Sequence, residues 1–237
     1  MWVYLSGSVH ITPVFEHAIS VVCLSKAVGD FFKEKDKKRK YAKAFSLVMW
    51  PMLACCAFIN RIITGNPKET LIESELKSGD DVVNLYNTLF NNSDELHLFQ
   101  DARFLKWAYS MKGCSFKKYF AYHHQDLLGY LTIDISDSSL PQICDFAFKD
   151  RKTFALLWNQ ANRDLKRAHV TFIKISFNYR NHALSRMAHY FYFNGFAPFY
   201  RGGNMVVRSA DERYKTVCAD ISKWYITPLW LYLYKRE

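Results

Sequence analysis

The chain of 237 residues has no sequence pattern that would mark a metal centre or a nucleic-acid-binding module. None of its six cysteines forms a C-x-x-C pair, and no histidines and cysteines share the spacing of a zinc site. Signatures of RRM, KH and helix-turn-helix modules are also missing. We therefore expect no metal, disfavour nucleic acid as a partner, and expect buried, reduced cysteines in a cytosolic protein.

A secretory leader is missing as well. The first residues lack a basic n-region and a small-residue cleavage site, so we expect a cytoplasmic location. The uncharged run 44–59 is shorter than the roughly 20 residues that cross a bilayer, and it contains Pro51. A basic run, 33–43, precedes it. Two interpretations stay open: a buried helix pair beside a solvated charged loop, or peripheral contact of 33–59 with an anionic membrane.

The composition that is present suits a packed domain. Half of the residues are hydrophobic and 17% are aromatic, which is ample for a core. The formal net charge is +10 and the pI is about 9.2. This balance favours an anionic partner, such as a phosphorylated cofactor, an acidic glycan or a membrane surface, without choosing among them.

Hydrophobic periodicity separates the chain into two parts. Residues 17–32 and 44–59 are predicted to be helical, residues 64–69 read as a breaker, and 68–91 as one or two helices. Residues 91–95 read as a loop with a helix cap. We therefore predict a helical N-terminal segment, or the remnant of an upstream domain, at 1–95 and a second domain at 96–237.

The second part shows a clearer order of elements. A short helix is predicted at 101–110, and two strands joined near Gln125-Asp126 lie within 116–136. A strand at 140–148, a helix at 153–168 and a strand at 169–178 form a β-α-β unit, so these two strands are expected to be parallel. A helix over 181–195 ends at Gly195, and closing strands are expected within 196–210 and 221–233.

This order and three of its segments resemble the GNAT acyltransferase superfamily. The segments are DARFLKWAY (101–109), HHQDLLGYLTI (123–133) and NHALSRMAHYFYFNGF (181–196). The resemblance is nearer to the C-terminal GNAT-like domain of bacterial acetyltransferases, some linked to polysaccharide biosynthesis, which often follows another GNAT domain. It covers roughly 100–237. It implies an α+β fold whose mixed sheet opens between the fourth and fifth strands, where acyl-CoA enters.

The resemblance also implies a cofactor site. Pantetheine would follow Phe146, Ala147 and Phe148, the pyrophosphate would meet the turn of Lys149, Arg151, Lys152 and Thr153, and Asn181 would begin the next helix of the site. The family turn usually carries two glycines, which this turn lacks, and Asp150 adds a negative charge. Two interpretations remain: the three cations replace the backbone donors, or the turn is a solvated helix entry without a cofactor.

Each candidate catalytic group also has two interpretations, one catalytic and one structural. Asp145 lies within an apolar strand, where a buried carboxylate is costly without a partner. With a raised pKa it would serve as a general base, whereas in a salt bridge to a neighbouring strand it would have a structural role. The family places an acid tyrosine four residues before the glycine, but Phe191 stands there. Its neighbours Tyr190 and Tyr192 are the substitutes, each about 100° away on a helix, unless all three pack on the sheet.

The end of the chain departs from the family as well. Trp224 and Tyr225 match the resembling domains, whereas apolar residues stand where an acidic pair usually follows. Two functions are therefore carried forward. One is transfer of an acyl group from CoA to an amine or hydroxyl, and the other is a non-catalytic binding or scaffold module with a degenerate CoA site, at a membrane or a glycan.

Overall fold

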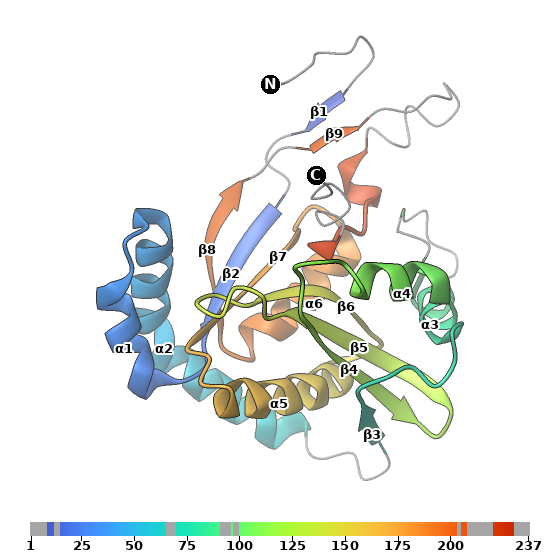
Figure 1. Cartoon of the computed structure of the whole chain (residues 1–237), viewed down its shortest axis with the longest axis horizontal. Coiled ribbons are helices and arrows are strands. Elements are labelled where there is room, and N and C mark those ends of the chain that lie inside the picture. Colours follow the sequence, from blue (N-terminus) through green and yellow to red (C-terminus); the bar gives the residue numbers. More distant parts are fainter. Residues whose placement is uncertain are drawn as a thin grey trace.

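The computed structural model describes residues 9–11, 15–64, 70–90, 96, 100–202, 205–207 and 220–229 (Figure 1). Its helices are α1 (Leu24–Lys33), α2 (Lys37–Thr64), α3 (Asp81–Phe90), α4 (Ala102–Tyr109), α5 (Arg151–Arg167) and α6 (His182–Tyr192), with a 3-10 turn at Ile221–Lys223. Its strands are β1 (Val9–Ile11), β2 (Phe15–Val21), β3 (Thr70–Glu73), β4 (Phe116–His123), β5 (Asp126–Asp134), β6 (Gln142–Phe148), β7 (Phe172–Asn178), β8 (Phe196–Gly202) and β9 (Met205–Val207).

Seven strands form one mixed sheet in the order β3-β4-β5-β6-β7-β2-β8. Only β6 and β7 are parallel among these neighbours, and α5 connects them, as the β-α-β pattern predicts. The short strands β1 and β9 pair separately. The expected α+β class with a GNAT-like mixed sheet is therefore confirmed.

The core lies on both faces of this sheet. Helices α5 and α6 cover one face, and α3 and α4 lie toward the other (Figure 1). The predicted inner face of α5 is buried throughout: Phe154, Leu157, Trp158, Ala161 and Leu165. Full burial of an apolar side chain of this size stabilises a fold by about 1.5–3 kcal/mol. This stripe therefore fixes α5, and with it the turn at its start, against the sheet.

The ends of the helices follow their sequence signals. Asp101, Asp150 and Asn181 each cap a helix by accepting a hydrogen bond from a backbone N–H in its first turn. Gly195 ends the α6 region with φ at +96°, a conformation that glycine adopts without a Cβ clash. The glycine stop predicted after this helix is thus observed.

The N-terminal third is helical at α1, α2 and α3, as predicted, but it also contributes strands to the sheet. Residues 15–21 form β2, which lies between β7 and β8, so the prediction of helix from residue 17 is wrong there. Burial along this strand does not alternate, since residues 18, 19 and 20 are all buried, and a short buried run of this kind suits either element. Strand β3 extends the other edge of the sheet. The predicted division at residue 95 therefore passes through a sheet that takes strands from both sides of it.

Two further expectations differ from the structure. Within the described residues 220–229, where a closing strand was expected, a 3-10 turn at Ile221–Lys223 is followed by chain without strand pairing, apart from one bridge between Leu96 and Trp224. Cys144 is buried as expected, whereas Cys55 on α2 is exposed. The predicted loop at 91–95 and most of the breaker at 64–69 lie outside the described residues.

Candidate functional site

Strands β6 and β7 separate one residue after they meet. Only Gln142 pairs with Lys174 and Ile143 with Ile175, so Cys144–Phe148 has no partner on the β7 side. On its other side β6 stays paired with β5 through Phe148. The opening that the resemblance implies is therefore present, and it begins after Ile143. Backbone groups along this half of β6 need other partners.

The chain's own segment 221–227 supplies a partner for one of these backbone groups, the Phe146 carbonyl, and also bonds to Asn178 at the end of β7. The backbone N–H of Asn178 donates to the carbonyl of Ile226 at 3.3 Å, and its side-chain amide donates to Ile221 and Trp224 carbonyls, each at 2.8 Å. The Tyr225 hydroxyl donates to the Phe146 carbonyl at 2.7 Å. Residues 225–229 are all buried. The segment is thus held by β7 and reaches across to β6.

Aromatic and sulfur contacts fill the space around Tyr225. Its ring lies edge-on against Tyr86 and Phe90 of α3, with centroids 5.8 and 4.9 Å away. Its hydroxyl is also 3.5 Å from the Met187 sulfur of α6. Tyr225 is only 1% exposed. One side chain therefore joins the helices of both faces through the gap between the strands.

Asn181 has a structural task in this arrangement. Its side-chain oxygen accepts from the Leu184 N–H at the start of α6, and its amide donates to the Ser222 carbonyl at 3.0 Å. The side chain is fully buried. The residue that the resemblance assigned to cofactor binding thus uses both ends of its amide to hold α6 and the C-terminal segment together.

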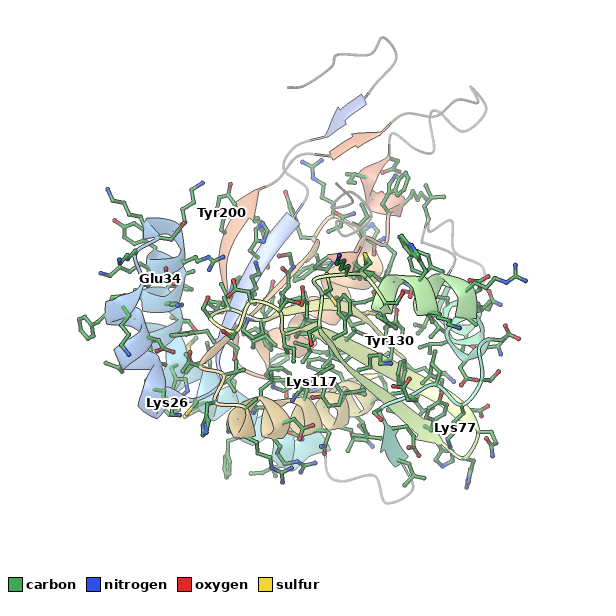
Figure 2. All side chains as sticks on the ribbon, in the orientation of Figure 1. Lys26, Glu34, Lys77, Lys117, Tyr130 and Tyr200 are labelled. Atoms are coloured by element: carbon green, nitrogen blue, oxygen red, sulfur yellow. The ribbon has the colours of Figure 1, made fainter. Side chains whose placement is uncertain are left out.

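Asp145 lies at the centre of a buried polar network. The hydroxyl of Tyr130 donates to one carboxylate oxygen at 2.9 Å, and the hydroxyl of Thr227 donates to the other at 2.8 Å. Tyr130 also lies 3.0 Å from the Tyr86 hydroxyl, and Gln100 bonds to both phenols. Tyr130 lies in the interior of the molecule (Figure 2). No cation takes part in these hydrogen bonds among the described residues.

Burial governs the protonation of this network. Removal from water raises the pKa of Asp145 to about 6, while the hydrogen bonds from Thr227 and Tyr130 act in the opposite direction. Burial also raises the pKa of the Tyr86 and Tyr130 phenols well above their usual value, so both remain protonated donors. A carboxylate poised near neutrality suits a general base, but this one is fully buried.

The turn before α5 is occupied by its own carboxylate. Asp150 accepts a hydrogen bond from the Thr153 N–H at 2.8 Å, the donor geometry that a phosphate would require. Lys149 and Lys152 are exposed, and the Arg151 guanidinium lies 4.9 Å from the Phe193 ring centroid. The start of α5 therefore already has an anionic cap.

The aromatic residues of α6 point to different places. Phe191 is fully buried among Phe146, Phe154 and Phe196. Tyr190 is half-buried against Phe148, with ring centroids 5.9 Å apart. The strand register puts Phe146 and Phe148 on the α5 side of β6 and Asp145 on the opposite side, because successive side chains alternate. Tyr190 and Asp145 therefore lie on opposite faces of the sheet.

Tyr192 belongs to a separate hollow. It lines a cavity of about 370 Å³ on the β8 side, together with Glu16, Pro198, Tyr200 and Arg201. Glu16 and Arg201 form an ion pair there at 2.6 Å. The structure thus brings neither Tyr190 nor Tyr192 to Asp145.

Among the described residues, no group of His, Cys, Asp or Glu could hold a metal ion.

Sequence reasoning missed the residues that complete the network. Tyr86, Gln100, Tyr130 and Thr227 come from four separate segments, and nothing in their local patterns marks them as partners of one carboxylate. One signal was available for Tyr225, since the Trp224-Tyr225 pair matches the resembling domains. The role of that pair depends on where β6 and β7 separate.

No family model matches the chain, and no curated protein matches it either. Solved structures resemble it at low identity. A tandem GNAT protein from the clavulanic acid biosynthesis pathway is 12% identical with a TM-score of 0.47, over 86% of this chain and 57% of its own. A GCN5-related N-acetyltransferase from Anabaena variabilis is 10% identical with a TM-score of 0.41, over 60% and 36%.

A functionally unknown conserved protein from Staphylococcus epidermidis is 11% identical with a TM-score of 0.47, over 83% of this chain and 62% of its own. The chain spans less than two thirds of each of these three proteins. Two of these neighbours are described as GNAT proteins.

Proposed function

We propose that the chain is a GNAT-like binding module that does not use acyl-CoA, because its own C-terminal segment takes the place of the cofactor. The observation that carries this proposal is the hydrogen bond from the Tyr225 hydroxyl to the Phe146 carbonyl. That carbonyl faces the opening between β6 and β7, where the resemblance places pantetheine. A cofactor would have to displace a buried tyrosine and its hydrogen bond.

The phosphate end of the site supports the same proposal. A pyrophosphate at the start of α5 would approach the Asp150 carboxylate, which already accepts the Thr153 N–H. The carboxylate and the pyrophosphate would repel each other, because both are negatively charged. The attraction of the exposed lysines for the pyrophosphate is weakened by solvent and salt. The residues present therefore do not fit acyl-CoA at either end, and we derive no chemical step through it.

Calorimetric titration with acetyl-CoA tests this function. We expect no binding heat for the wild-type protein at millimolar ligand, and no release of CoA when amines or hydroxyl compounds are added. The matched variant is Tyr225→Ala, which empties the space beside Phe146 while keeping the Asp150 cap. A dissociation constant in the micromolar range for the wild type would contradict the proposal.

A second candidate is acyl transfer from CoA to an amine or hydroxyl, and the buried Asp145 favours it. A carboxylate with a pKa of about 6 has the basicity that proton abstraction requires. This function needs residues 224–227 to leave the opening so that the substrates can reach the base. Turnover by the wild type that Asp145→Asn abolishes, with the fold retained, would select this candidate.

A further inference from the structure

Helix α2 carries a continuous apolar stripe on its outer side. The stripe has successive spacings of four, three, four, seven and three residues, which keeps it on one face of a helix. At 1.5 Å per residue it is about 32 Å long. Its members are Tyr41, Phe45, Val48, Met52, Ile59 and Ile62, of which Val48 is 77% exposed. Isolated exposed apolar residues are ordinary, but a stripe of this length indicates a contact surface.

Helix α1 adds to the same exposed apolar area. Leu24, Val28 and Phe32 recur every four residues along it, and all three are exposed. Helices α1 and α2 pack against each other and form the outer edge of the molecule beside β8 and β2 (Figure 1). We call these nine residues of the two helices the α1–α2 surface.

The opposite side of α2 is packed on the domain. Ala42, Ser46 and Leu53 are buried, and α2 contacts β2, β8 and α5. By length and composition, Lys37–Ile59 is the one helical segment in the described part of the chain that could cross a membrane, and 22% of it is buried. A helix that keeps these contacts lies along the protein. It can enter the surface layer of a bilayer without crossing it.

Basic residues gather at one end of the stripe. Residues 33–40 contain six basic and two acidic side chains. Glu34 pairs with Lys43, and Asp36 accepts the Arg39 N–H in the first turn of α2, so both acids are engaged within the helix pair. Lys33, Lys35, Lys37 and Lys38 are exposed. Lys26 and Glu34 lie at the same outer edge of the molecule (Figure 2).

The charge pattern distinguishes a lipid surface from a second copy of the chain. Residues 44–60 contain no charged side chain, and 44–64 contain no acidic one. A parallel copy would set one lysine cluster against the other, and an antiparallel copy would find no acid to pair with it. Two packed helices also need charged residues beside the apolar stripe to fix their register, and residues 44–60 contain none. An anionic headgroup layer complements the lysines, and its acyl boundary accepts the stripe.

We propose that the α1–α2 surface docks the protein on an anionic membrane, with α2 lying in the membrane plane. The stripe enters the boundary between headgroups and acyl chains, and the lysines of 33–40 contact lipid phosphates. This places the sheet and the C-terminal segment on the aqueous side. The inference stands on α1 and α2 alone, so acetyl-CoA titration and membrane binding succeed or fail separately.

Flotation with lipid vesicles tests the docking. We expect the protein to float with vesicles of phosphatidylcholine and phosphatidylglycerol, to stay in the dense fraction with phosphatidylcholine alone, and to dissociate as salt rises. Charge reversal at Lys35, Lys37 and Lys38 should lower the partition coefficient at least about a hundredfold, since each basic residue near an anionic surface contributes about fivefold. Val48→Asp should lower it at least tenfold.

Matched variants separate docking from folding. Lys112→Glu and Leu71→Ser change exposed residues of the same kinds elsewhere and should leave flotation unchanged. All the substituted side chains are exposed or partly so, and thermal unfolding without lipid should agree among the variants. Failure of the wild type to float with anionic vesicles would overturn the proposal. A lipid-free dimer that Val48→Asp converts to monomer would overturn it in favour of a second copy.

Discussion

Replacement of Asp145 by asparagine should change the pH dependence of stability, because the carboxylate costs free energy whenever it is ionised. Its pKa is raised from 3.8 to about 6 by burial in the folded protein. Between these values the folded chain binds more protons than the unfolded one, so stability falls as pH rises through this window. Below pH 3.8 both states are protonated and the cost disappears.

The size of the effect follows from the shift. A difference of about two pKa units corresponds to about 3 kcal/mol, complete above pH 6, with about half of it already present at pH 5. Asparagine keeps the shape of the side chain and cannot ionise. The hydroxyls of Tyr130 and Thr227 can each rotate to donate to its oxygen or accept from its amide.

Urea unfolding of both proteins from pH 5 to pH 8 measures this cost. We expect the wild type to lose stability relative to Asp145→Asn by an amount on the order of 1 kcal/mol over this range, with the loss ending near pH 6 to 7. Asp126→Asn, at an exposed carboxylate of β5, controls for general charge effects and should show no such difference. Parallel pH curves for the wild type and Asp145→Asn would refute a buried carboxylate with a raised pKa.

Three further substitutions test individual contacts by equilibrium unfolding. Tyr225→Phe removes the donor to the Phe146 carbonyl and should cost about 1–3 kcal/mol, unlike a change at an exposed tyrosine. Gly129→Ala places a Cβ 2.6 Å from the Cβ of Phe148 and 2.8 Å from its Cα, so about 1–3 kcal/mol or more should be lost, and wild-type stability would show that β5 and β6 are further apart. Asp150→Ala removes the α5 cap at a cost of about 1 kcal/mol, and an unchanged midpoint would mean that the cap contributes nothing.

The sequence predicted much of the sheet because its signals there are local. The alternation over β4 and β5, the helical face of α5 and the glycine after α6 each depend on neighbouring residues. The parallel pairing of β6 and β7 followed from the connection between them. The place of β2 could not be predicted, since seven residues with mixed burial contain nothing that selects β7 and β8 as their neighbours.

The candidate site was less accessible to sequence reasoning because its contacts are distant in the chain. The sequence marked Asp145 as a costly buried carboxylate, which the structure agrees with, but its partners Tyr130 and Thr227 lie 15 and 82 residues away. The missing glycines before α5 correctly directed attention to Asp150, whose cap is a local interaction. The position of Tyr225 in the opening depends on long-range packing that no short pattern encodes.

Hydrogen exchange of the backbone amides around 220–229 tests the central claim most directly, because the claim is that this segment fills the opening between β6 and β7. The Tyr225 N–H donates to the Leu96 carbonyl at 2.8 Å, and the Asn178 N–H donates to Ile226. We expect both amides to exchange slowly, like those of the central strands, and acetyl-CoA to leave their rates unchanged. Exchange as fast as in an unfolded peptide, or release of both amides by acetyl-CoA, would contradict the account.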